Sequence, residues 1–136
     1  MQNRWDSQEA AAAGDDALAL RVYSSRLLGA EPDLVLHGGG NTSVKDRRPD
    51  FFGEEADLIF VKGSGWDLGT IEAPGFAPVR MGPLLKMAEL AELSDPDMVR
   101  EQRAAMTDPD APTPSIEAIL HAIIPGKFVD HTHADA

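Results

Sequence analysis

Apolar residues recur at helical spacing in several segments of the chain. Residues 6–28 are rich in Ala and Leu, with apolar side chains about one helical turn apart, and this pattern predicts a helix that stops at Gly29. The segment 84–94 shows similar spacing. The pair Asp95-Pro96 is expected to cap and open another, polar helix that runs to about residue 105. These segments predict three helices.

Short runs of β-prone residues lie between these helices. They occupy 34–36, 41–45 and 58–61, and polar or glycine-containing segments bound them, including a predicted surface turn at 47–55. The stretch 66–81 contains several glycine and proline residues, so we predict irregular structure there. The chain is therefore expected to contain both strands and helices.

A further helix is predicted from Thr113, where a proline follows, to the Pro-Gly pair that begins at Pro125. Its apolar positions form one stripe, which we expect to face the core: Ile116, Ile119, Leu120, Ile123 and Ile124. The helix leads directly into 128–133, which alternates polar and apolar residues like a half-buried strand.

Length, charge and cysteine content narrow the possible functions. A chain of 136 residues fits one domain. Its net charge of −11 repels phosphate backbones and anionic lipids, so we expect neither nucleic acid nor a membrane as a partner. There is no cysteine, so a metal would depend on imidazole and carboxylate ligands. Without a basic and then apolar start in 1–20, the sequence predicts an unprocessed cytoplasmic protein.

The candidate metal ligands are His131 and His133 on the last predicted strand. Residues two apart on a strand leave the same face, about 7 Å apart at the backbone, so both imidazoles can reach one divalent ion. Asp135 shares this face, whereas Asp130 and Thr132 point to the other. The alternative is a pair of structural histidines on a half-exposed strand.

Glu117 is the candidate acid/base because it lies off the isoleucine stripe, on the helix that leads into the histidine strand. The alternative is a solvated glutamate that the helix dipole favours in the first turn. His121 lies one turn further on, where it can pair with Glu117 or simply cover the core.

Two glycine-rich loops follow predicted strands, at 37–43 and 62–65. Their bare backbone N–H groups, with neighbouring amide and hydroxyl groups, are typical of phosphate-binding loops, although glycine is equally the ordinary residue of tight turns. Ser115, near the start of the Glu117 helix, adds a third possible anion donor.

In this order, the segments resemble the class II aldolase/adducin family from about residue 18 to residue 136. The resemblance implies a three-layer α/β/α fold with a mainly antiparallel central sheet. It also implies an acid/base at Glu117 and a bound Zn²⁺, or another divalent metal, on His131 and His133. The phosphate-binding residues that it implies are Gly40, Asn41, Ser43, Ser64, Gly65 and Ser115.

Residues 61–68 and 128–136 look closest to the aldolase half of bifunctional rhamnulose-1-phosphate aldolase/short-chain dehydrogenase proteins, in which a dehydrogenase domain follows. Two departures stand out. Ile116 occupies a position where simple aldolases often have a second hydroxyl residue. The family's third zinc histidine lies downstream of His133, beyond Ala136, so 1–136 is expected to be a truncated domain without its last strands.

The activity that the resemblance implies is zinc-dependent cleavage of a ketose 1-phosphate, such as rhamnulose 1-phosphate, to dihydroxyacetone phosphate and an aldehyde in carbohydrate catabolism. With two family ligands, the fragment itself is expected to be inactive unless another residue replaces the third. The candidates are His37, His121, Asp135 and Glu117. A sugar-phosphate epimerase or dehydratase, a non-catalytic adducin-like module and a plain α/β fragment with structural histidines are the alternatives. The full-length protein is expected to form a homotetramer.

Overall fold

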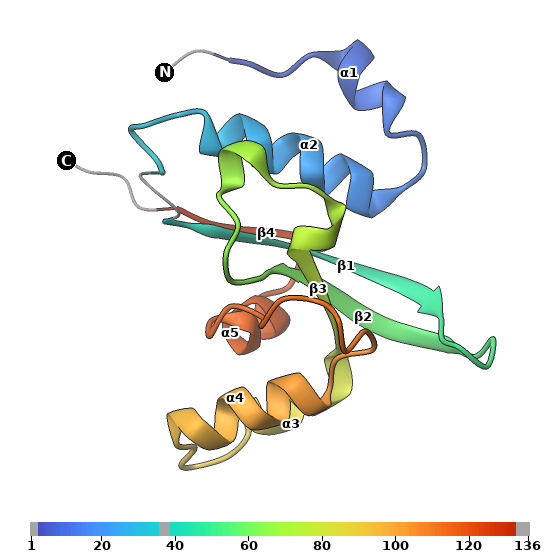
Figure 1. Cartoon of the computed structure of the whole chain (residues 1–136), viewed down its shortest axis with the longest axis vertical. Coiled ribbons are helices and arrows are strands. Elements are labelled where there is room, and N and C mark those ends of the chain that lie inside the picture. The colour runs from blue at the N-terminus through green and yellow to red at the C-terminus, as the bar shows by residue number, and fades with distance from the viewer. Residues whose placement is uncertain (1–2, 36–38, 133–136) are drawn as a thin grey trace.

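The computed structural model describes residues 3–35 and 39–132, and these form three layers (Figure 1). The central layer is a four-stranded antiparallel sheet in the order β3-β2-β1-β4. Helix α2 (Ala17–Gly29) covers one face (Figure 1). On the opposite side lie α3 (Met81–Ala88), α4 (Asp95–Ala104) and α5 (Ala118–Ile123). The predicted three-layer α/β/α fold with an antiparallel sheet is therefore confirmed. The strands are β1 (Asn41–Pro49), β2 (Glu55–Lys62), β3 (Phe76–Arg80) and β4 (Phe128–His131).

Strands β1 and β2 form a hairpin that is longer than the sequence predicted. Pairing runs from Ser43 opposite Val61 to Pro49 opposite Glu55, so the strand predicted at 41–45 continues through the first three residues of the predicted turn. Asp50 makes the shorter turn possible, because its side chain accepts the backbone N–H groups of residues 52 and 54. Pro49 cannot donate to the ladder and is tolerated at the end of the strand.

The two faces of the sheet bury different clusters. The cluster on the α2 side includes Val44, Phe60 and Phe76, with Val22 of α2 packed against it. On the other side, Ile59 and Val61 pack with Val79, Leu84 of α3 (Met81–Ala88) and Ala118 of α5 (Ala118–Ile123). The hairpin strands thus contribute to both layers, with alternate residues on opposite faces.

The prediction of a single helix at 6–28 is wrong, because this segment forms two helices, α1 (Ser7–Ala12) and α2 (Ala17–Gly29). Gly14 has φ +61°, and the Asp16 side chain accepts the N–H groups of Leu18 and Ala19. An aspartate that binds nearby N–H groups caps a new helix rather than extending the old one.

Two predictions about strands are also wrong. Residues 32–34 form a turn rather than the start of a strand, and Leu36 lies outside the described residues. The segment predicted to be irregular contains β3, whose Val79 and Pro78 pair with Ile59 and Phe60 of β2. A proline is compatible with a strand at the edge of a sheet, and pairing with β2 outweighs the weak local preference of this segment.

The last helix begins later than predicted and turns a different face to the core. Helix α5 starts at Ala118, and its buried residues are Ala118, His121 and Ala122. Much of the predicted stripe is exposed, with Ile116 at 66% and Ile123 at 50%, although Ile119 is partly buried. Small side chains let α5 approach the sheet and α3 closely, and the large isoleucines are left outside.

The remaining helix boundaries shift by a few residues. Helix α3 begins at Met81 and ends at Ala88, earlier than the predicted 84–94. Helix α4 (Asp95–Ala104) is capped by Ser94 rather than Asp95, because the Ser94 hydroxyl accepts the Asp97 N–H at 3.3 Å. Within the described ranges, no helix has both the length and the apolar composition to cross a membrane.

Gly29 is required where the end of α2 meets the short 3₁₀ helix Leu68–Thr70, because a Cβ there would overlap the backbone of Leu68 and Gly69. Replacing Gly29 with Ala is expected to lower the free energy of unfolding by about 2 kcal/mol, since backbone cannot move aside as a side chain can. Gly82→Ala in α3 is the matched control. A Cβ at Gly82 meets open space, so stability should be unchanged or raised by up to about 1 kcal/mol. Urea unfolding of both variants tests this, and equal midpoints would contradict it.

Candidate active site

Two loops and the approach to α5 enclose a hollow of about 340 Å³ at the end of the β1–β2 hairpin remote from its turn. We call it the loop hollow. Its lining includes Gly40, Asn41, Lys62, Ser64 and Ser115. Loops that are distant in the sequence thus supply amide, hydroxyl and ammonium groups to one concave surface, a donor set that suits an anion such as phosphate.

Backbone hydrogen bonds hold the 62–65 loop against the approach to α5. The Ser64 N–H donates to the Thr113 carbonyl at 2.9 Å, and the Ser115 N–H donates to the Lys62 carbonyl at 3.0 Å. Gly63 lies between them, and a Cβ at this position would collide with the Pro112 ring. A glycine is therefore needed for the close approach that shapes the loop hollow.

At the rim of the loop hollow, Glu117, Asn41 and His131 meet. Glu117 Oε2 contacts His131 Nδ1 and accepts a hydrogen bond from Asn41 Nδ2 at 3.3 Å. The Glu117 N–H donates to the Ser115 hydroxyl at 3.1 Å, so two lining residues hold Glu117. His131 and Asn41 are paired neighbours on β4 and β1, and their side chains therefore leave the same face of the sheet.

Beneath this rim lies His121, which is only 1% exposed. Its Nδ1 is 2.7 Å from Ser43 Oγ, and its Nε2 contacts Asn41 Oδ1. Burial lowers the pKa of His121 to about 4, an effect that Glu117 partly opposes. His121 is therefore neutral at pH 7. The sequence left open whether it pairs with Glu117 or covers the core, and in the structure it lies in the core and binds Ser43 and Asn41.

The structure brings together most of the residues that the sequence singled out for phosphate, but not all of them. Gly40, Asn41, Ser64 and Ser115 line the loop hollow. Gly65 is not among the lining residues, and its φ of +86° is a turn conformation. Ser43 does not reach the loop hollow either, because it is buried against His121.

Lys62 also lines the loop hollow, and sequence reasoning placed it in the 62–65 loop without giving its side chain a role. It is largely buried, which lowers the pKa of its amine, while the nearby Asp67 raises it. A lysine placed between a buried strand and a glycine loop was the available signal. Its ammonium group adds positive charge, which favours anion binding in a protein whose net charge is negative.

The rim offers two side chains of the kinds that bind a divalent metal, whereas a catalytic zinc site usually has three protein ligands. The His131 imidazole and the Glu117 carboxylate are the nitrogen and oxygen donors that zinc accepts. No group of three such side chains occurs within 3–35 and 39–132. His133, His37 and Asp135 lie outside the described residues. His121 is not a ready substitute, because both of its ring nitrogens already contact Ser43 and Asn41.

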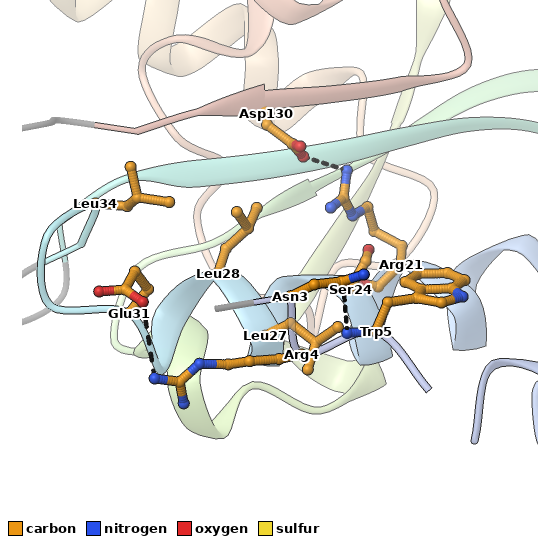
Figure 2. A pocket seen from close by; sticks show the side chains of 10 residues that line it. All are labelled: Asn3, Arg4, Trp5, Arg21, Ser24, Leu27, Leu28, Glu31, Leu34 and Asp130. Atoms are coloured by element: carbon orange, nitrogen blue, oxygen red, sulfur yellow. Dashed lines mark hydrogen bonds and ion pairs between the residues drawn. The ribbon is translucent and has the colours of Figure 1, made fainter. Parts of the chain in front are cut away.

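The opposite face of β4 carries a different interaction (Figure 2). Asp130 points toward α2, as its alternation with His131 predicted, and pairs with Arg21 Nη1 at 2.6 Å. A pocket of about 350 Å³ lies beside this pair, with Trp5, Leu28 and Leu34 among its lining residues (Figure 2). The sheet separates it from Glu117 and His131, so this pocket is not part of the candidate active site.

The architecture is that of the class II aldolase domains. A solved N-terminal class II aldolase domain of a conserved protein from Thermoplasma acidophilum matches with a TM-score of 0.91 and 45% identity over 99% of this chain and 61% of that chain. Residues 20–136 match the model described as the class II aldolase and adducin N-terminal domain, and the chain belongs to this family. Members usually use a divalent metal ion.

A further relative is a Bacillus subtilis protein, "Uncharacterized oxidoreductase YuxG", which is 41% identical over 132 residues. The match covers 97% of this chain and 19% of that protein. The chain thus corresponds to a small part of one relative and to about three fifths of the solved domain.

Proposed function

We propose that this domain cleaves a phosphorylated ketose by a retro-aldol reaction. The observation that carries the proposal is the position of Glu117, whose carboxylate meets His131 and Asn41 at the rim of the loop hollow. A proton-transferring group, a metal-ligating imidazole and anion donors are the three parts that the reaction needs. Membership of the class II aldolase family supports this combination.

In this proposal the loop hollow binds the phosphate of the substrate. The Ser64 and Ser115 hydroxyls and the backbone at Gly40 donate hydrogen bonds, and the Lys62 ammonium supplies positive charge. Because the phosphate would be held beside Asn41, the carbon chain of the sugar would extend toward Glu117 at the rim. Binding of the remote phosphate thus orients the reacting carbons.

In the cleavage direction, Glu117 would give a proton to the carbon that becomes nucleophilic when the carbon–carbon bond breaks. The proton released from the neighbouring hydroxyl as the aldehyde forms would restore the proton on Glu117. His131, with His133 from beyond the described residues, would hold a divalent cation, for which Zn²⁺ is our proposal. When bound, the cation supplies a Lewis acid that stabilises negative charge developing on the substrate oxygen. We propose rhamnulose 1-phosphate or a similar ketose 1-phosphate as the substrate, and the products would be dihydroxyacetone phosphate and an aldehyde.

The test uses the full-length protein, with bound zinc and formation of dihydroxyacetone phosphate from rhamnulose 1-phosphate measured together. We expect near-stoichiometric zinc, cleavage that a chelator abolishes, and recovery when zinc is returned. Fuculose 1-phosphate and ribulose 5-phosphate serve as comparison substrates. A protein that binds no zinc and cleaves none of the three would overturn the proposal. Epimerisation without cleavage would replace it with the epimerase alternative.

A further inference from the structure

His121 joins two residues of β1 through opposite sides of one buried ring. Asn41 and Ser43 are two positions apart, so their side chains leave the same face of the strand, toward α5. The Ser43 hydroxyl meets Nδ1 at 2.7 Å, and the Asn41 amide oxygen meets Nε2. The ring does not line the loop hollow, so it can act on a bound substrate only through these neighbours.

The hydrogen-bond partners determine which ring nitrogen carries the proton. Asn41 Nδ2 faces the Glu117 carboxylate at 3.3 Å, and a carboxylate oxygen only accepts, so the amide nitrogen must lie on that side. The amide oxygen then faces His121, whose Nε2 must donate to it. His121 Nδ1 consequently accepts the hydrogen of the Ser43 hydroxyl. A neutral ring has one N–H, and this single arrangement satisfies all three contacts.

We infer that His121 is a positioning residue, which locks the Asn41 side-chain amide with its N–H₂ group toward Glu117 and the loop hollow. The inference deepens the proposed function and rests on it for its effect on the reaction. A flipped amide would turn a carbonyl oxygen toward the Glu117 carboxylate and toward an incoming phosphate, and both contacts are repulsive. Ser43 holds the other side of the ring. We therefore assign this buried serine to the support of His121 rather than to contact with phosphate.

A matched pair of variants separates positioning from general support of the fold. The side-chain nitrogen of Gln reaches about as far as Nε2 of His, whereas the amide of Asn reaches only the Nδ1 position. Each variant gives up one of the two hydrogen bonds of His121. We therefore expect His121→Gln and His121→Asn to unfold at similar temperatures. Only His121→Gln should keep the hydrogen bond to the Asn41 amide oxygen, whereas His121→Asn should keep the one to Ser43.

We expect His121→Asn to lower kcat/KM for the ketose 1-phosphate by about 10–100-fold, as is usual when the support of a site residue is lost. KM should rise, and inhibition by inorganic phosphate should weaken. His121→Gln should recover most of this loss. Equal losses in the two variants, or none in either, would overturn the inference, since a merely structural role affects both alike.

A measurement on the unaltered protein keeps the inference testable if the variants unfold. Selective ¹⁵N-labelling of histidine reports by NMR which nitrogen of the His121 ring carries the proton, and the Nε2–H form is expected at pH 7. An Nδ1–H form would overturn the inference even if cleavage is observed. The Nε2–H form in a protein that cleaves no sugar phosphate would instead count against the proposed function and leave the positioning of Asn41 in place.

Discussion

Replacing Glu117 with Gln is expected to lower the rate of ketose 1-phosphate cleavage by about 10²–10⁴-fold, the usual contribution of a positioned general acid or base. The amide of Gln has nearly the size of the carboxylate, and its oxygen can still accept the Asn41 N–H that the structure shows. It cannot take up and return a proton at the substrate carbon. Steady-state cleavage of the full-length protein measures the loss, which should appear in kcat.

Zinc content distinguishes proton transfer from metal binding in this experiment. We expect the Glu117→Gln protein to retain its zinc, because His131 and His133 are the proposed ligands. Loss of zinc together with cleavage would make Glu117 a metal ligand and contradict the proposed role. Glu89→Gln, which alters an exposed carboxylate just after α3, controls for the change of net charge and should cleave at the parental rate.

The second large effect is expected on stability, from Asp130→Asn in β4. Arg21 is only 2% exposed, and burial lowers the pKa of its guanidinium, while Asp130 raises it. Among the described residues the guanidinium also contacts the Ser43 carbonyl, 3.4 Å from Nη1, and the Phe128 ring, while its Nε has no hydrogen-bond partner. Asp130 is the carboxylate that neutralises this cation. Removing the carboxylate leaves a buried charge uncompensated, which should lower the free energy of unfolding by about 3 kcal/mol.

The effect should be unequal for the two partners, because Asp130 is 48% exposed and water can solvate it when Arg21 is absent. Arg21→Met should therefore cost less than Asp130→Asn, and the double variant should cost less than the sum of the two. Urea unfolding of all three at pH 7 completes the double-mutant cycle. A strictly additive result would contradict the coupling.

Asp57→Asn serves as the surface control for this cycle. Asp57 and Arg47 lie 3.0 Å apart, but their side chains are 68% and 69% exposed. Water screens such a pair and long side chains lose entropy when they form it, so the change should stay below about 1 kcal/mol. A cost for Asp57→Asn as large as that for Asp130→Asn would show that burial is not the cause.

Local sequence patterns were sufficient to predict several strands and helices, and the family resemblance implied how they are layered. The apolar run 58–61 predicted a buried strand, which the structure extends to Glu55–Lys62. Strand β4 coincides with the start of the alternating segment at 128–133. The order of the glycine loops, Glu117 and the histidines carried the family resemblance, and this did not require knowledge of how the segments pack. The positions of strands and loops can be predicted from short-range periodicity and from turn residues, because both are local properties of the sequence.

Tertiary contacts decided what these patterns left open. Pro78 lies in a strand because every residue of β3 has a partner on β2. Helix α5 buries Ala118 and Ala122 rather than its large isoleucines, because small side chains allow close packing against α3 and β2. Neither result follows from the local preference of a residue for helix or strand, since both depend on contacts with segments that are remote in the sequence.

The relation between the candidate site residues also belongs to the tertiary structure. The sequence by itself singled out Asn41, Ser43 and Glu117 as polar residues of a possible site. It marked His121 as a partner of Glu117, a core residue or a substitute metal ligand. The structure separates their positions, with Asn41 and Glu117 at the rim of the loop hollow and Ser43 behind it on His121. A one-dimensional pattern shows which face of a strand a residue shares, but the side chain that meets it comes from a helix nearly 80 residues away, and only packing brings the two together.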